Sequence, residues 1–228
     1  MSSHGTRGDG PPTGGAGPAP LRRDAQRNRE LLIAAAREVY AEQGVEAPLD
    51  DIARRAGVGN ATLYRRFPTR GALIEAVFGE GLTATLHRGE EARAAEDAWS
   101  GLVHYLEHIF EGLAADRGAN DLMTTGIQGI PSLENLKAHH HETVSLLFAR
   151  AREQGTLRSD VVVEDLLFAL AALGRVVPAS VTVAPDAWRR HLHLLLDGLR
   201  TEAARPLPAP PLTSGQLAGA LNSLAGHG

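Results

Sequence analysis

The sequence predicts an all-α protein, and three observations lead to this fold class. Apolar residues recur at intervals of three and four along most of the 228 residues, which is the period of a helix that buries one face. Glycine, proline and capping residues stand where these periodic stretches end. No stretch alternates apolar and polar residues over more than a few positions, as a half-buried strand does. We therefore expect helices throughout and no sheet.

The composition excludes several classes of protein. No run approaches the roughly 18 apolar residues that cross a membrane, so no membrane partner is expected. The chain has no cysteine, which excludes disulfides, thiol nucleophiles and zinc sites made of thiolates. Residues 1–20 are rich in glycine, proline, serine and threonine and lack the apolar core of a secretory signal. We interpret them as the disordered leader of a cytoplasmic protein.

Charge is distributed unevenly along the chain, whose net charge is −4 at pH 7. Residues 21–70 hold ten arginines against seven acidic residues, whereas residues 71–228 hold twelve basic against nineteen acidic residues. A local positive excess attracts phosphate groups. The first segment is therefore the better candidate for contact with nucleic acid.

Three helices are expected in residues 21–70. The first runs from about residue 26 to residue 43, where Gly44 ends it. The second covers residues 49–56 between Pro48 and Gly57, and the third covers residues 60–67, which Pro68 ends. Arginines at positions 22, 23, 27 and 29 open this segment and fit either a solvated helix start or an arm along a DNA backbone. The apolar stripe of the first helix consists of Leu32, Ala35, Ala36, Val39 and Tyr40.

Longer helices are expected after residue 70. Thr69, Asp97 and Ser132 are suited to cap three of them, because their side-chain oxygens can accept from the free amides of a helix start. Gly155 can end the third of these. The expected helices span residues 70–95, 98–115, 121–128, 133–154, 164–177 and 186–201, of which 121–128 has the weakest pattern.

The tail from residue 202 begins as a linker that contains four prolines. Thr213-x-x-Gln216 then has the form of a capping box. Leu217, Leu221 and Leu224 follow on one helical stripe. We expect a short amphipathic helix here, which needs a surface to pack on because so short a helix is marginal alone.

Residues 49–67 have the features of a helix-turn-helix. Ala53 and Ala56 are small enough to let the next helix cross closely, and Gly57 can adopt the left-handed conformation of a sharp turn. Leu63 and Phe67, four residues apart, can bury one face of the second helix. Such a motif lays its second helix in the major groove of DNA. The residues left on the outer face of that helix are Asn60, Ala61, Thr62, Tyr64, Arg65 and Arg66.

These outer residues suit contact with DNA. Arg65 and Arg66 can bond to guanine or to a phosphate, and Asn60 can pair with adenine. Thr62 and Tyr64 offer hydroxyl groups to phosphates. The alternative is a short surface helix within an ordinary bundle, which would give an exposed tyrosine beside two arginines little purpose.

The same stretch resembles the DNA-binding signature of the TetR family of transcriptional regulators. The resemblance rests on Ile52-Ala53-x-x-Ala56-Gly57-Val58 and on Thr62-Leu63-Tyr64-x-x-Phe67-x-x-Arg70-x-x-Leu73. It implies an N-terminal three-helix helix-turn-helix domain, joined by a long helix to a C-terminal helical domain that binds a ligand and dimerises. It also implies DNA contacts from the recognition helix, from Tyr64 and from Arg70.

Three positions depart from the family pattern. Pro48 and Gly59 stand where the family usually has threonine or serine caps that also touch phosphate, and only backbone N–H groups remain at these helix starts. Arg70 replaces the more usual lysine and keeps its charge. Further along, Gly155-x-Leu157-Arg158-x-Asp160 resembles the stretch before the last two helices of many such regulators.

The last two long helices are candidates for a dimer interface. The helix 164–177 is apolar around nearly its whole circumference, so it must be covered on all sides. A fully buried helix in a monomer is one explanation. The resemblance favours the other, in which these helices pair with their copies in a homodimer and set two recognition helices about 34 Å apart. The predicted interface residues are Leu166, Leu170, Leu173, Trp188, Leu192, Leu195 and Leu199.

The resemblance also implies a small-molecule pocket among the central helices. His104 and His108 have a spacing that could chelate a metal, but no clear third ligand accompanies them, so no metal site and no cofactor are expected. No nucleophile motif, phosphate loop or carboxylate pair indicates an enzyme. The candidate pocket residues are Trp99, Leu102, Tyr105, Leu106, Ile109, Phe110, Met123, Ile127, Phe148 and Phe168.

Together these observations predict a dimeric transcriptional repressor that binds a palindromic operator and leaves it when a small effector binds. The alternatives are a helical small-molecule-binding protein without DNA binding, and a helical enzyme that uses the two histidines with a metal. The expected regions are a leader (1–20), a DNA-binding domain (21–70), a ligand-binding and dimerisation domain (71–201) and a proline-rich tail with a short helix (202–228).

Overall fold

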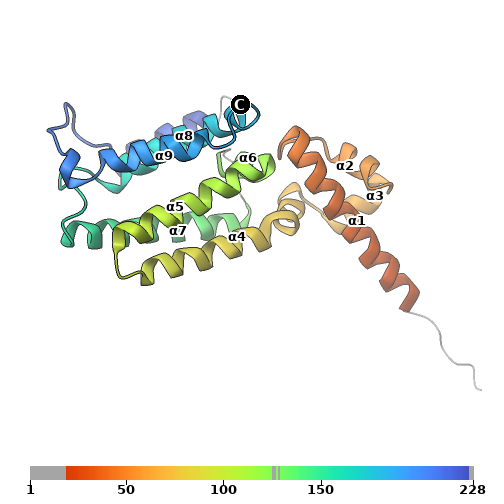
Figure 1. Cartoon of the computed structure of the whole chain (residues 1–228). Coiled ribbons are helices and arrows are strands. Elements are labelled where there is room, and N and C mark those ends of the chain that lie inside the picture. Colours follow the sequence, from red (N-terminus) through yellow and green to blue (C-terminus); the bar gives the residue numbers. More distant parts are fainter. Residues whose placement is uncertain (1–18, 125–126, 128, 226–228) are drawn as a thin grey trace, which may run out of the picture.

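The computed structural model describes residues 19–124, 127 and 129–225, and every regular element among them is helical (Figure 1). The prediction of an all-α fold is confirmed, because extended backbone pairs in these residues only at an isolated bridge between Leu157 and Arg200. Three N-terminal helices stand at one end of the molecule and the helices after α4 at the other, with α4 running from the first group into the second (Figure 1). Over the same residues, no helix combines the length and the apolar character that a membrane crossing requires.

The N-terminal group consists of α1 (Ala19–Gln43), α2 (Leu49–Arg55), α3 (Asn60–Arg66) and the first half of α4 (Arg70–Ala94). Their apolar faces close one core, to which α6 and the start of α7 also contribute. This core extends past residue 70, the expected end of the domain, because the first turns of α4 pack into it. Its fully buried residues include Leu32, Ala36, Tyr40, Ile52, Leu63, Leu73 and Ile74.

α1 begins at Ala19 rather than near residue 26. No glycine or proline interrupts residues 21–43, and arginine and glutamine are good helix formers. Residues 1–18 of the expected disordered leader lie outside the described residues, whereas residues 19 and 20 belong to the helix. The start of α1 projects beyond the three-helix core (Figure 1). Arg23 and Arg27 precede Leu32, the first core residue of this helix, and both are exposed.

The C-terminal group consists of α5 (Ala98–Ala115), α6 (Arg117–Thr124), α7 (Pro131–Glu153), α8 (Val163–Val181) and α9 (Ala187–Gly198). A 3₁₀ turn (Thr201–Ala203) and an exposed linker lead to α10 (Ser214–Ala225), which packs on α8. α5, α7, α8 and α9 close a second core with the second half of α4. Its most buried residues are Leu102, Tyr105, Leu106, Phe110, Val144, Leu147, Phe148, Leu166, Leu192 and Leu196.

Two of the three expected caps are confirmed. The side chains of Thr69 and Asp97 accept hydrogen bonds from amides in the first turns of α4 and α5, at 3.1 and 3.0 Å. The expected cap at Ser132 is wrong, because Pro131 already occupies the first turn of α7. The Ser132 hydroxyl donates instead to the carboxylate of Glu75 at 2.9 Å, which ties α7 to α4.

Besides α1, three helices differ clearly in extent from the expected ranges. α6 begins earlier than 121–128, because the Asp116 carboxylate accepts from the amide of Ala119 at 3.1 Å and caps the chain there. Residues 125, 126 and 128 of that expected helix lie outside the described residues. α8 continues past residue 177 with Pro178 inside it. α9 ends before residue 201, because the amide of Thr201 donates to the carbonyl of Thr156 at 3.0 Å and draws this stretch out of the helix.

Candidate DNA-binding surface and ligand cavity

α3 places its apolar side chains in the core and its polar ones at the surface. Leu63 is 1% exposed, and Phe67, directly after the helix, is 4% exposed. Thr62 and Arg66 are half-buried. The predicted DNA-contacting residues that are exposed are Asn60, Ala61, Tyr64 and Arg65.

The turn between α2 and α3 fixes this orientation. Gly57 has a φ of +67°, a left-handed conformation that strains any residue with a Cβ atom. The amide of Val58 donates to the carbonyl of Ala53 at 3.0 Å, and Val58 packs against the N-terminal core. The chain thus reverses within a few residues, as a helix-turn-helix requires.

α1 packs against the helix-turn-helix and contacts it through charged side chains. The guanidinium of Arg55 in α2 donates to the carboxylates of Glu42 and Glu38 in α1, at 2.7 and 3.1 Å. The hydrogen bond from Arg55 lowers the pKa of Glu42, so this carboxylate stays charged and paired. Closer to the start of α1, the guanidinium of Arg29 lies 5.7 Å from the ring centre of Phe67. These contacts hold α1 against both helices of the motif.

Asn60 has a partner within the motif. Its amide nitrogen donates to the carboxylate of Asp50 in α2 at 2.9 Å. A contact between Asn60 and adenine therefore requires that this hydrogen bond break or be shared.

The two arginines of α3, Arg65 and Arg66, form no ion pair with the described part of the chain. Among the described residues, no acidic side chain forms an ion pair with Arg65 or Arg66 within 4 Å. The Nε atom of Arg66 is buried and has no hydrogen-bond partner in the same set of residues. A buried donor without a partner is costly.

Arg70 has a structural role that the sequence did not reveal. Its guanidinium donates through one nitrogen to the carbonyls of Val45 and Ala47, at 2.9 and 2.6 Å. These bonds tie the loop before α2 to the start of α4. The predicted phosphate contact of Arg70 would have to come from the other nitrogens of the guanidinium.

The sequence matches two described protein families over most of its length. Residues 32–77 match the family "Bacterial regulatory proteins, tetR family", which covers the helix-turn-helix and the start of α4. Residues 97–201 match "Transcriptional regulator SbtR-like, C-terminal domain", which covers α5 to α9. The chain belongs to the TetR family of transcriptional regulators. The predicted family is thereby confirmed.

Individual relatives agree with this assignment. A TetR regulatory protein from Mycobacterium vanbaalenii is 32% identical over 80% of this chain and 100% of that chain, with a TM-score of 0.43. An HTH-type transcriptional regulator of Bacillus subtilis, YvdT, is 34% identical over 83 residues, and the match covers 36% of this chain and 43% of that protein. FadR from Bacillus subtilis, solved in complex with stearoyl-CoA, shares the fold at 18% identity and a TM-score of 0.57, over 77% of this chain and 99% of that chain.

The C-terminal domain of this TetR-family protein contains a cavity of about 500 Å³ between α5, α6, α7, α8 and α10. Of the predicted pocket residues, Leu106, Ile109, Phe110 and Met123 line it. Trp99, Leu102 and Phe148 are instead buried in the second core and do not reach it. Ile127 packs against the N-terminal core, and Phe168 is 45% exposed.

The polar part of the cavity wall was not among the predicted pocket residues. α7 contributes Lys137, His140 and His141, whose spacing of three and four residues places them on one helix face. This spacing could have indicated a polar helix face at the cavity. The histidines were instead interpreted as surface residues. Burial lowers the pKa of His140 to about 4, so this imidazole is neutral at pH 7.

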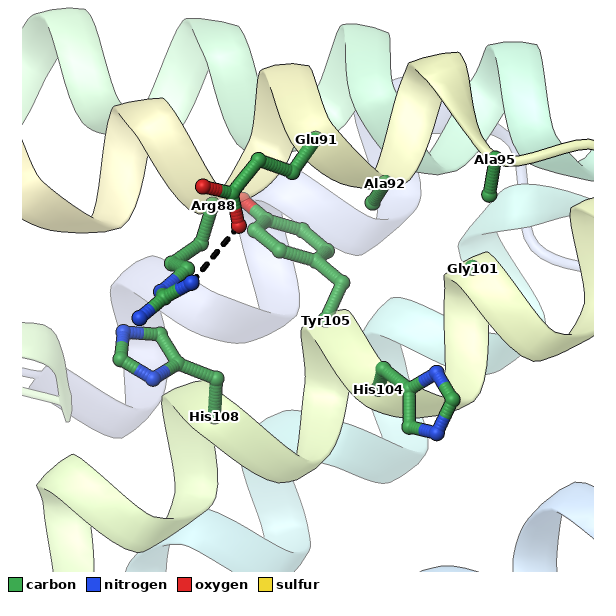
Figure 2. A pocket seen from close by; sticks show the side chains of 8 residues that line it. All are labelled: Arg88, Glu91, Ala92, Ala95, Gly101, His104, Tyr105 and His108. Carbon is green, nitrogen blue, oxygen red and sulfur yellow. Dashed lines mark hydrogen bonds and ion pairs between the residues drawn. The ribbon is translucent and has the colours of Figure 1, made fainter.

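Tyr105 lines a different hollow, of about 350 Å³, between α4 and α5 (Figure 2). His104 and His108 lie on the same wall, and Figure 2 shows that their rings do not converge. Nearby, Arg88 forms an ion pair with Glu91 at 2.7 Å. Across the described residues, no three histidine, cysteine or acidic side chains are grouped so that they could hold a metal ion.

The predicted interface residues divide into two groups. Leu173 and Leu195 are partly buried and, with the buried Trp188, line a hollow between α8 and α9. The others are buried in the second core of their own chain. This second group consists of Leu166, Leu170, Leu192 and Leu199.

Proposed function

We propose that this protein is a ligand-released repressor that binds a palindromic operator as a homodimer. The observation that carries the proposal is the outer face of α3, where Tyr64 and Arg65 are exposed and, among the described residues, no acidic side chain pairs with Arg65. An arginine at such a position can bond to guanine, and a tyrosine hydroxyl can bond to a phosphate.

The projecting part of α1 extends this surface. Arg23 and Arg27 are exposed and lie four residues apart, on one face of the helix. Since Arg29 of the same helix stacks on Phe67 at the end of α3, the projection starts beside the recognition helix. Of the two interpretations of these arginines, this position favours an arm along the DNA backbone.

A dimer through α8 and α9 would cover apolar surface that the monomer leaves in solvent. Val176 of α8 and Leu194 of α9 are each 58% exposed, and Phe168 is 45% exposed. Val176 lines the same hollow as Leu173 and Leu195. Apolar patches of this kind mark protein interfaces. The proposed interface therefore rests on this outer face rather than on the leucines in the core.

α6 offers a route from the cavity to the DNA-binding domain. Met123 and Thr124 of α6 line the cavity. At the other end of the helix, the Arg117 guanidinium donates to the carbonyl of Glu42 at the end of α1, at 3.1 Å. A ligand that displaced α6 would shift α1 and, with it, α3. In its fold relative FadR the bound molecule is stearoyl-CoA, which supports a small-molecule role for the cavity here.

Selection of genomic DNA fragments by the purified protein, followed by titration at increasing salt, tests the proposal. If two protomers make about 6–10 ionic phosphate contacts, affinity should fall by roughly 10³–10⁵ between about 50 and 200 mM salt. A flat salt response from the folded protein would favour the alternative, a small-molecule-binding protein without DNA binding.

The Arg65→Ala variant sharpens this test. It should weaken operator binding by about 1–3 kcal/mol and relax the preference for one base pair in each half-site. Arg88→Ala is the matched control, because it removes the same charge from the middle of α4 and leaves α3 intact. An equal loss of specific and non-specific binding in Arg65→Ala would assign Arg65 to a phosphate instead of a base.

A further inference from the structure

The tail helix α10 forms part of the wall of the C-terminal cavity. Leu217 is 6% exposed, and it lines the cavity together with Leu221 and Asn222 of the next turn. At the start of α10, the Ser214 hydroxyl donates to the carboxylate of Glu164 in α8. The cavity is thus closed on one side by a segment that follows the domain in sequence.

The tail is fixed at its beginning and again at α10, with an exposed linker between. Arg158 is 6% exposed, and its guanidinium donates to the carbonyl of Arg205 where the linker starts. The linker residues 206–211 are exposed and include four prolines, which keep a chain extended. α10 can therefore leave α8 without disturbing the fold on the domain side of Arg205.

α10 depends on its docked position. It has twelve residues, and its reciprocal cap is formed by Thr213 and Gln216, whose amides and side chains bond at 2.9 and 3.3 Å. Isolated helices shorter than about 12–15 residues are marginal in water even with good caps. The contacts of Leu217 and Ser214 with the domain thus decide whether α10 is present. A ligand that touches α10 from inside the cavity would add to those contacts.

The cavity wall has an apolar part and a polar part. α5 contributes only apolar side chains to it, among them Ile109 and Phe110. The polar side chains of the wall include Lys137, His140 and His141 of α7 and the charged Glu164 and Arg175 of α8. Among the described residues, Lys137 is exposed and has no ion pair within 4 Å. An anion beside Lys137 would stabilise the ammonium group. Such a wall fits a molecule with an apolar body and an anionic end.

We propose that α10 is a closing wall of the ligand site, and that the site takes an amphipathic organic anion with its charged end at Lys137. This inference rests on the proposed function only in placing the effector in this cavity. Closure by α10 slows release of the ligand, because the apolar body is covered by Leu217 and Leu221. Loss of α10 opens the cavity to water from that side.

Two fluorescent probes with the same ring system test the proposal. Anilinonaphthalene sulfonate is an amphipathic anion, and N-phenyl-1-naphthylamine is its neutral counterpart. The full-length protein should bind one sulfonate probe per protomer, roughly tenfold more tightly than the neutral probe. Lys137→Gln should remove that preference, whereas His104→Gln, on the wall of the other hollow, should keep it. Equal binding of the two probes by the full-length protein, or no saturable site, would overturn the ligand class.

Removal of the tail after Pro211 tests the closing wall. The truncated protein should lose roughly tenfold in affinity for the sulfonate probe, mainly through faster dissociation in stopped-flow measurements. The full-length double variant Leu217→Ser/Leu221→Ser should behave in the same way, and Leu207→Ser in the exposed linker should not. Unchanged dissociation in both the truncated and the double variant would overturn the role of α10. Neither measurement involves DNA, so a failure of operator binding would refute the proposed function while leaving this inference intact.

Discussion

The helices α3 and α8 differ in how their apolar residues are arranged. In α3, Leu63 is the only buried apolar side chain within the helix, and polar residues occupy the remaining faces. In α8, Leu166 and Leu170 are buried in the core, yet Phe168 and Val176 on other faces are 45% and 58% exposed. α8 is therefore apolar on more sides than its own chain can cover.

This difference explains where prediction from sequence worked. A helix with a single apolar face has one orientation that buries it, so the outer residues of α3 follow directly from the pattern. A helix that is apolar all round has several such orientations. For α8 the pattern predicts that a second surface must cover the helix, but not which of its residues meet that surface.

A charge on the outer face of α8 should give the largest effect. Val176→Glu should dissociate the proposed dimer, because burial of an unpaired carboxylate costs several kcal/mol in each protomer. Operator affinity should fall with it, since one recognition helix makes half of the contacts. Sedimentation equilibrium and DNA titration measure both effects. Val183→Glu, just beyond α8 and 83% exposed, should change neither. A Val176→Glu protein that stays dimeric and binds DNA normally would exclude this face as the interface.

A deletion on the inner face of α8 should destabilise the fold itself. Leu166→Ala should lower the free energy of unfolding by about 2–5 kcal/mol, because it leaves a cavity in the second core. Leu146→Ala on α7, where the side chain is 43% exposed, is the matched control and should cost far less. Urea unfolding measures the free energy of unfolding of both variants and of the wild type. Similar losses in both would show that Leu166 is not a core residue.

Residues 139–141 are three consecutive histidines, and the sequence pattern does not show which imidazole the fold removes from water. The folded-state pKa of His140 is about 4, below the value of about 6.5 in an unfolded chain. The unfolded state therefore binds the proton first, and this contribution to stability is lost as pH falls from about 6.5 to about 4. Its size is on the order of 2–3 kcal/mol.

Denaturant unfolding across that pH range measures the effect of His140. His140→Gln should flatten the pH dependence of the free energy of unfolding. The control His104→Gln concerns an exposed histidine and should leave the pH dependence as it is in the wild type. A wild-type protein whose stability did not change between pH 6.5 and 4 would contradict the lowered pKa of His140.

The smallest effect is expected at a helix cap, where the sequence alone was sufficient. Thr69→Ala removes the oxygen that accepts from the first turn of α4 and should cost about 1 kcal/mol. Thr83→Ala, in the exposed middle of α4, should be neutral or slightly stabilising, since alanine is the better helix former. Thermal unfolding compares the pair. Equal stability of the two variants would show that the Thr69 cap does not stabilise α4.

Local chemistry along the chain determined the helix order, the caps at Thr69 and Asp97, the turn at Gly57 and the outer residues of α3. Each of these depends on residues only a few positions apart. Even there, the sequence did not show that Arg70 holds the loop before α2, because its partners are the distant carbonyls of Val45 and Ala47.

Only the tertiary structure decided how the C-terminal helices divide their apolar residues. It placed Trp99, Leu102 and Phe148 in the core and brought Lys137 to a cavity wall with Leu217 of the tail helix. Apolar burial is non-directional, so it requires that such side chains be covered without specifying what covers them. Segments far apart in sequence supply that cover, and which segment does so depends on how the whole set of helices packs together.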